Sequence, residues 1–273
     1  RLTMEPSKEF VFKYKGFYFG VNTSVEHVAS LENFEIKDSD IFIATYPKSG
    51  TVWTQNILSL ILHEGHRNGT ENMDIMDRIP WLEYNIKNID FTSLPVPRRK
   101  EDLKCPAKNG KIDQNHTGYT CQKTYCDFRK IFVPVVLQII YVTRNPKDVL
   151  VSYYHFSKFI ITLEEVPDFN IFMERFLAGK VLASSWFDHV AGWYGHAEDF
   201  NILFLTYEEM KKDLRSAVLK ICNFLGKKLS EEEIESVVRQ ATFENMKKDP
   251  RANYENLPDD IADKNKGRFL RKG

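Results

Sequence analysis

The stretch "TYPKSGTVWTQ" at residues 45–55 decides the fold. It overlaps the end of the apolar run "DIFIATY" (40–46) and the start of "TVWTQNILSLILHEG" (51–65). In this second stretch apolar residues recur at helical spacing. A short apolar run bounded by charge and by a turn sequence is typical of a buried parallel strand. A strand, a glycine-containing loop and a helix in this order predict an α/β protein that can hold an anion at the helix N-terminus.

The loop between this strand and helix has the residues that an anion site needs. Lys48 brings a positive charge, and Gly50 lets the backbone approach a ligand closely. Ser49, Thr51 and Thr54 add hydroxyl donors. The GxxxxGK[ST] signature of the common phosphate loop is absent, so these residues alone also fit an ordinary turn with a surface lysine.

Further strand and helix signals follow along the chain. The apolar runs at 136–143 and 201–207 read as two more buried strands, and 17–22 reads as an edge strand. An amphipathic helix is expected over 208–226, and Ser230 with Glu233 forms a capping box that opens the next helix. We therefore predict a single α/β domain over the whole chain, with a central parallel sheet flanked by helices.

A second anion site is expected where the strand at 136–143 ends. Arg144 follows this strand, Asn145 and Pro146 open a helix, and Ser152 lies about two turns into it. An arginine can bind a phosphate through two hydrogen bonds, although a salt bridge is the plain alternative. Together with the cations of "FLRKG" near the end, these junctions suggest a ligand with two separated anionic groups.

Composition and charge exclude several classes of protein. Lysine plus arginine and aspartate plus glutamate number 38 each, which argues against a general nucleic-acid binder or a polybasic membrane protein. No secretory h-region and no apolar stretch long enough for a membrane span are present. The four cysteines lack CxxC spacing and fit reduced thiols, so we expect a cytoplasmic protein.

At this point the sequence resembles the cytosolic sulfotransferases, and most closely the amine sulfotransferase branch. The resemblance implies a PAPS-dependent enzyme of xenobiotic metabolism, where PAPS is 3'-phosphoadenosine 5'-phosphosulfate, a donor with an anionic group at each end. It implies no metal and a small amine, phenol or alcohol as acceptor. The matching pieces are "TYPKSGTVWTQNIL", "IPWLEYN", "YVTRNPKDVLVSYYHF", "SSWFDHVAGWY", "FLTYEEMKKDLRSAVLKICNFLGKKL", "ATFENMKKDPRANY" and "FLRKG".

The resemblance also implies roles for individual residues. Lys48 is the expected catalytic residue, which stabilises charge on the bridging oxygen during in-line sulfuryl transfer. The expected cofactor-binding residues are Lys48, Ser49, Gly50, Thr51, Val52, Trp53, Arg144, Ser152, Tyr207, Thr242, Phe243, Met246, Phe269, Leu270, Arg271, Lys272 and Gly273. The expected acceptor-binding residues are Phe19, Trp81, Tyr84, Phe156 and Tyr254.

Two departures from the family pattern are visible. The Thr-His-Leu-Pro motif, which carries the family's catalytic base, is missing from the polar, insert-like segment 98–138, in which no strand is expected before its end. His116 lies in this segment, but nothing around it resembles a positioned base. The sequence also ends at Gly273, without the family's C-terminal segment and dimerisation motif, so the resemblance leaves the family's homodimer possible but without that motif.

These departures leave alternatives open. The first hypothesis is an active sulfotransferase, and the alternative is a catalytically weak or inactive protein that binds PAPS or its desulfated product. A small-molecule or nucleotide kinase is a third hypothesis. It is disfavoured because no strand ends in the aspartate that a magnesium–nucleotide site requires.

Overall fold

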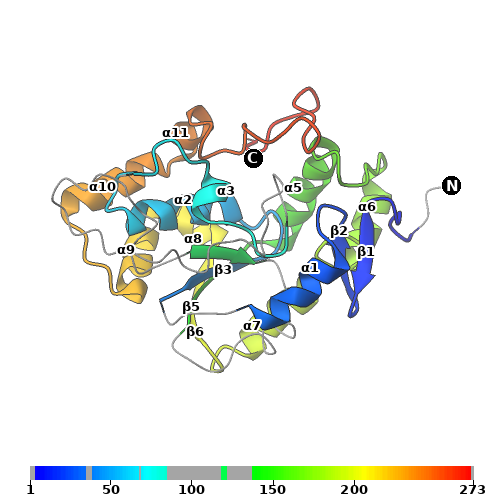
Figure 1. Cartoon of the computed structure of the whole chain (residues 1–273), viewed down its shortest axis with the longest axis horizontal. Coiled ribbons are helices and arrows are strands. Elements are labelled where there is room, and N and C mark those ends of the chain that lie inside the picture. Colours follow the sequence, from blue (N-terminus) through cyan, green and yellow to red (C-terminus); the bar gives the residue numbers. More distant parts are fainter. Residues whose placement is uncertain (1–3, 35–38, 68, 85–117, 122–136, 272–273) are drawn as a thin grey trace.

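The computed structural model describes residues 4–34, 39–67, 69–84, 118–121 and 137–271, and Figure 1 shows their arrangement. The predictions for His116, Lys272 and Gly273 concern residues outside these ranges.

The described chain contains a four-stranded parallel sheet and a separate hairpin. The sheet has the order β4-β3-β5-β6, and β1 pairs with β2 in antiparallel fashion. The strands are β1 Val11–Tyr14, β2 Phe17–Gly20, β3 Ile41–Thr45, β4 Gly118–Cys121, β5 Gln138–Thr143 and β6 Asn201–Thr206. The predicted parallel sheet is thereby confirmed, and the strand expected near residue 17 belongs to the hairpin.

Helices lie on both sides of the sheet, as the α/β prediction requires (Figure 1). The helices are α1 Val25–Ser30, α2 Thr51–Leu62, α3 Ile75–Arg78, α5 Pro146–Phe159, α6 Phe169–Leu177, α7 Trp186–Gly195, α8 Tyr207–Lys212, α9 Leu214–Leu225, α10 Glu231–Gln240 and α11 Phe243–Lys248, with a short 3-10 helix η1 at Leu31–Asn33.

The residues of β3 alternate between two hydrophobic cores. Ile41 and Ile43 belong to the larger core with apolar residues of α2, α5, α9 and α10, whereas Phe42 and Ala44 pack in the smaller core with Trp193 of α7. All five residues of β3 are buried. A strand covered on both faces needs a continuous apolar sequence, which is why this run could be recognised in the sequence as a parallel strand.

Three expectations about secondary structure were wrong in part. The strand at 201–207 is β6, but only Leu205 in it is fully buried, because β6 is the edge strand of the described sheet. The helix expected over 208–226 breaks into α8 and α9 at Asp213, whose side chain accepts a hydrogen bond from the Ser216 backbone N–H and caps α9. The segment 98–138 contains β4, which is too short to show alternation but pairs with β3.

The register of the sheet brings the candidate ligand-binding segments together. Thr45 at the end of β3 pairs with Val142 of β5, and Thr143 at the end of β5 pairs with Thr206 of β6. These parallel strands therefore end at one edge of the sheet, where the segments that follow them meet.

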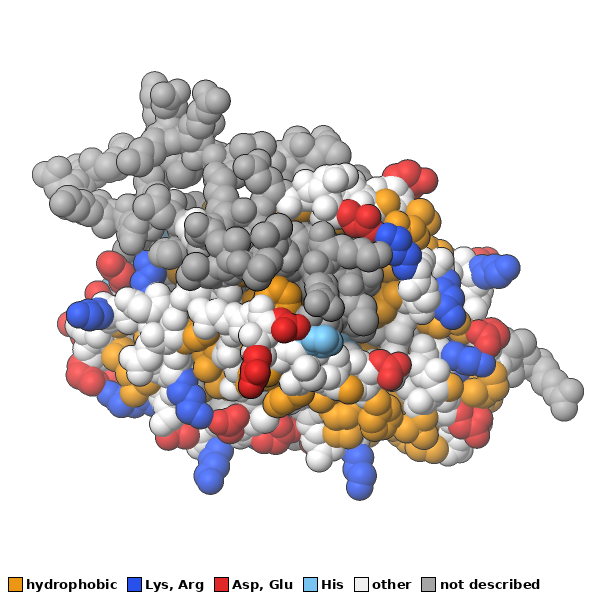
Figure 2. Space-filling model, turned by 90° about the horizontal axis from the view of Figure 1, so that it is seen from below, with side chains coloured by type: hydrophobic (Ala, Val, Ile, Leu, Met, Phe, Trp, Pro, Cys, Tyr) orange, Lys and Arg blue, Asp and Glu red, His pale blue; other side chains and the backbone are white. Residues whose placement is uncertain are grey.

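None of the helices in the described part of the chain has the length and apolar character needed to cross a bilayer. On the face shown in Figure 2, basic and acidic side chains are interspersed rather than gathered by sign.

Two neighbouring glutamates allow a test of which ion pairs stabilise this fold. The carboxylate of Glu164 accepts hydrogen bonds from Arg175 at 2.9 Å and from the Ser7 backbone N–H at 2.7 Å, and the Arg175 side chain is only 2% exposed. Glu165 instead pairs with Lys266, and both side chains are largely exposed.

We expect Glu164→Ala to lower the free energy of unfolding by about 3 kcal/mol, because it removes a carboxylate from a buried guanidinium. Glu165→Ala is the control, with an expected loss below about 1 kcal/mol. Urea unfolding of both variants measures the difference, and equal losses would contradict the importance of the buried pair.

Candidate functional site

The loop between β3 and α2 is shaped by two residues with left-handed backbone conformations. Lys48 has a φ of 67° and Gly50 has a φ of 104°. A Cβ atom at Gly50 would lie 2.9 Å from the Tyr207 ring, so glycine is required both by its conformation and by the close approach of this ring. Among the residues that the structure describes, no side chain caps the N-terminus of α2, which leaves its first backbone N–H groups facing the loop.

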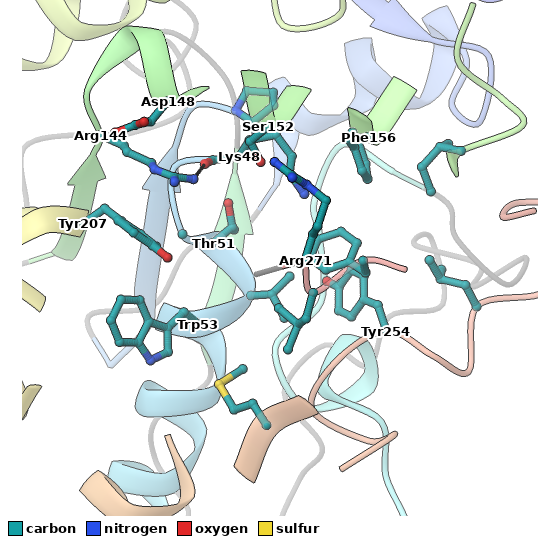
Figure 3. A pocket seen from close by; sticks show the side chains of 18 of the residues that line it. Lys48, Thr51, Trp53, Arg144, Asp148, Ser152, Phe156, Tyr207, Tyr254 and Arg271 are labelled. Atoms are coloured by element: carbon teal, nitrogen blue, oxygen red, sulfur yellow. Dashed lines mark hydrogen bonds between the residues drawn. The ribbon is translucent and has the colours of Figure 1, made fainter. Parts of the chain in front are cut away.

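Arg144 connects this loop to the end of β5. Its Nη1 donates a hydrogen bond to the Lys48 carbonyl at 3.1 Å, and its guanidinium lies 4.1 Å from the centre of the Tyr207 ring. The Tyr207 ring meets the Trp53 ring edge to face at 5.2 Å, and Trp53 donates from Nε1 to the Ala241 carbonyl at 2.7 Å. In Figure 3 these side chains form one wall of the pocket.

One buried polar atom at this wall has no partner. Arg144 Nε is buried and has no hydrogen-bond partner among the described residues, and Arg144 lines the cavity. Buried polar groups are normally hydrogen-bonded, so a ligand in the cavity could satisfy this donor. The uncapped helix N-terminus and the cations Lys48 and Arg144 fit an anionic group at this position.

The Lys48 ammonium lies between two aromatic rings. Its Nζ is 4.3 Å from the centre of the Phe156 ring of α5 and 4.0 Å from that of Phe269 near the end of the described chain. Loss of hydration, together with the nearby charges of Arg144 and Arg271, lowers the pKa of Lys48 to about 7. The unliganded site therefore disfavours the positive charge that an anionic ligand would restore.

A cavity of about 870 Å³ opens from the loop toward a second, aromatic wall. Figure 3 shows Arg144, Tyr207 and Trp53 on one side of Thr51, and Phe156 and Tyr254 on the other. The predicted site residues that line the cavity are Lys48, Gly50, Thr51, Val52, Trp53, Trp81, Tyr84, Arg144, Ser152, Phe156, Tyr207, Thr242, Phe243, Met246, Tyr254, Phe269, Leu270 and Arg271.

Two predicted residues lie elsewhere. The side chain of Ser49 is fully buried beside the loop instead of lining the cavity. Phe19 packs in the hairpin against Phe12 and Phe17, with ring centres 5.7 and 5.0 Å away, and the structure does not bring it to the cavity. This packing explains why an apolar residue stands at position 19 of the strand.

The cavity also contains polar residues that were not predicted. Asn22, Asp148 and Lys211 line it. Asp148 lies four residues before Ser152 on α5, and residues at this spacing share one face of a helix. The helical reading of this stretch could therefore have identified Asp148, whereas nothing in the local sequence marks Asn22 or Lys211.

Together, the fold and the site define an α/β protein in which cationic side chains and the N-terminus of α2 adjoin a cavity with aromatic lining. The sulfotransferase domain family matches residues 38–273, and the chain belongs to this family. The predicted membership and the predicted class of enzyme, a sulfotransferase, are confirmed. The roles assigned above to single residues stay predictions.

Similar proteins support this membership. The chain is 50% identical to an amine sulfotransferase of Oryctolagus cuniculus over 273 residues, which are 99% of this chain and 84% of the relative. It is 39% identical to sulfotransferase 2B1 of Mus musculus over 264 residues, which are 96% and 72% of the two chains.

Solved structures of related proteins contain PAP, described in one of them as the inactive cofactor. A mouse sulfotransferase complexed with PAP has a TM-score of 0.64 and 31% identity, with 87% of this chain and 76% of that chain covered. Retinol dehydratase in a complex with retinol and PAP has a TM-score of 0.71 and 25% identity, with 94% and 80% covered.

Arg144 is expected to contribute directly to anion binding. We predict that Arg144→Ala weakens binding of adenosine 3',5'-bisphosphate by about 1.5–3 kcal/mol, the contribution of a charge-assisted hydrogen bond. Lys147→Ala removes an exposed cation three residues away that does not line the cavity, and it should change affinity little. Calorimetry measures both, and equal affinities of the parent and Arg144→Ala would exclude this role.

The lowered pKa of Lys48 predicts proton uptake on binding. At pH 8, above the pKa of about 7, most Lys48 side chains in the free protein are neutral. An anionic ligand favours the ammonium form and raises this pKa, so binding of the bisphosphate should take up close to one proton at pH 8 and much less at pH 6.

Calorimetry at pH 8 in two buffers of different ionisation enthalpy measures this uptake. Lys48→Met should abolish it, whereas Lys147→Met should not. Uptake that persists in Lys48→Met would assign the titration to another group.

Proposed function

We propose that this sulfotransferase transfers the sulfuryl group of PAPS to a small apolar amine. The observation that carries the proposal is that one cavity joins the Arg144 side, at the ends of β3 and β5, to an aromatic half opposite it that contains Phe156 and Tyr254. Lys48 lies between the Phe156 and Phe269 rings, where the two parts meet. The relative at 50% identity, named an amine sulfotransferase, supports the choice of acceptor. The PAP complexes of related structures support the choice of donor.

The donor supplies the activated sulfuryl group, and the residues of this chain position and stabilise it. The N-terminus of α2 with Lys48 suits the phosphosulfate end, and Arg144 with Ser152 and Arg271 suits the 3'-phosphate. The Trp53 and Tyr207 rings on the Arg144 side of the cavity offer a surface on which adenine can stack. Aromatic side chains at Trp81, Tyr84, Phe156 and Tyr254 suit an apolar acceptor.

The reaction forms a nitrogen–sulfur bond and breaks the bond between sulfur and the bridging phosphate oxygen. The bridging oxygen keeps the electron pair, and the amine nitrogen loses one proton. Lys48 in its ammonium form stabilises the negative charge that develops on this oxygen. Positioning and charge stabilisation thus provide most of the catalysis, as in phosphoryl transfer.

An amine acceptor also fits the missing Thr-His-Leu-Pro motif. A neutral amine is already nucleophilic and can lose its proton after attack, whereas a phenol or alcohol depends more strongly on a positioned base, which typically contributes ~10²–10⁴-fold. We therefore propose amines as the better acceptors of this chain. We also propose a cytoplasmic location, supported by the resemblance to the cytosolic branch of the family.

The proposed function predicts sulfuryl transfer from labelled PAPS to an arylamine, with slower transfer to a phenol of similar size. Lys48→Met should reduce the rate of the bound complex more than it reduces affinity for the bisphosphate, because the charge that Lys48 stabilises grows in the transition state. Lys147→Met is the matched control and should leave both unchanged.

Three results would change the proposal. Binding of the bisphosphate without transfer to any acceptor would favour the alternative of a protein that binds the donor without useful catalysis. A phenol rate equal to the amine rate would indicate a base elsewhere in the chain. Loss of affinity in Lys48→Met with an intact rate of the bound complex would make Lys48 a ground-state anchor.

A further inference from the structure

A buried amide connects the helix of the anion site to the aromatic half of the cavity. Gln55 lies on α2, two residues after Trp53, and is fully buried. Its Nε2 donates to the Ile79 carbonyl at 3.1 Å and to Thr120 Oγ1 at 2.8 Å. Its Oε1 accepts a hydrogen bond from the Tyr254 hydroxyl at 3.1 Å. Gln55 itself does not line the cavity.

The Tyr254 hydroxyl extends this connection to a second aromatic side chain. It accepts a hydrogen bond from Trp81 Nε1 at 2.6 Å while donating to Gln55. Trp81 is 7% exposed and Tyr254 is 5% exposed, and both line the cavity. The Tyr254 hydroxyl thus fixes how the Trp81 and Tyr254 rings lie relative to each other.

The partners of Gln55 are themselves held in place. The Thr120 backbone N–H of β4 donates to the Pro80 carbonyl at 2.8 Å, and the Leu82 N–H donates to the Thr120 carbonyl at 3.0 Å. The amide therefore has a fixed position relative to the sheet, with both of its donors and its oxygen in use. In a buried, low-dielectric environment such a satisfied network is directional and rigid.

The rings that this network orients also contact other parts of the cavity. The Trp81 ring lies 5.7 Å from the Tyr84 ring, and the Tyr254 ring lies 4.7 Å from the Phe269 ring. Phe269 in turn covers the Lys48 ammonium. A change in the tilt of Tyr254 would therefore alter both the aromatic wall and the cover of Lys48.

We propose that Gln55 is a positioning residue that sets the shape of the acceptor half of the cavity by holding Trp81 and Tyr254 through hydrogen bonds. It acts without touching donor or acceptor, and its effect is on which acceptor shapes fit between the two rings. The inference rests on the proposed acceptor site. A merely structural role, in which Gln55 only stabilises the fold, would change all acceptors alike.

The first experiment compares Gln55→Leu, Tyr254→Phe and the double variant. We expect each variant to raise KM for a two-ring acceptor, 2-naphthylamine, about tenfold. This fold-change corresponds to the free energy of one lost buried hydrogen bond. The double variant should be no worse than either single variant, since all three break one network. KM for aniline, which is smaller, should change less than KM for 2-naphthylamine in all three variants, and the ratio of the two KM values is the readout.

Gln240→Leu is the matched control. The Gln240 amide is partly buried and donates to the Gly65 carbonyl at 2.7 Å and to Ser236 Oγ at 3.1 Å, away from the cavity. Its loss should lower the thermal midpoint without changing the ratio of the two KM values. Tyr254→Phe keeps the ring and serves as the test if Gln55→Leu does not fold.

A second measurement does not depend on turnover. The chain has four tryptophans, and the indole N–H resonance of Trp81 can be assigned in a ¹⁵N-labelled sample by its loss in Trp81→Phe. We expect this resonance to shift by more than its line width in Gln55→Leu and in Tyr254→Phe, and to stay in place in Gln240→Leu.

The two readouts separate the inference from the proposed function. If the parent transfers sulfuryl to no amine while the Trp81 resonance shifts as expected, the acceptor assignment fails and the positioning network stands. An unmoved Trp81 resonance in Gln55→Leu overturns the inference. The inference is also overturned if KM rises equally for both acceptors and in proportion to the loss of stability, since a structural role alone gives this result.

Discussion

The parallel pairing of β3 with β5 and of β5 with β6 is the constraint on which the rest of the structure depends. Because the three strands end at one edge, the segments carrying Lys48, Arg144 and Tyr207 leave the sheet side by side. Their contacts then follow at short range, with Arg144 bonded to the Lys48 carbonyl and set over the Tyr207 ring. A shift of one residue in this register would exchange the two faces of each strand and separate these side chains.

The same arrangement places Lys48 near two arginines. Loss of hydration, together with the nearby charges of Arg144 and Arg271, lowers the pKa of Lys48 to about 7. Cation–aromatic contacts and the hydrogen bond of Arg144 to a backbone carbonyl offset part of the cost of holding these groups together. An anion bound beside them would favour the charged form of Lys48.

The sequence predicted the parts of the fold that depend on local pattern. Strand β3 and the loop after it could be predicted because an apolar run, a glycine and a helical pattern follow one another directly in the sequence. Gln55 was not recognised, since one glutamine in a helical pattern does not show that its partner is Tyr254, far along the chain. Asp213 was missed because the apolar spacing continues across the break that its capping side chain makes. Phe19 was assigned to the cavity by resemblance alone, and the packing of the hairpin decided otherwise.

The double burial of β3 has a consequence for how the chain is made. Its five residues are apolar or small, and its β5 partners follow roughly a hundred residues later, so this pairing cannot form until that intervening stretch has left the ribosome. Until then the strand exposes an uncharged apolar segment whose backbone groups lack their final neighbours. Synthesis of this fold thus includes a period in which its central strand can associate with other nascent chains, and a chaperone that covers such segments would raise the yield of folded protein.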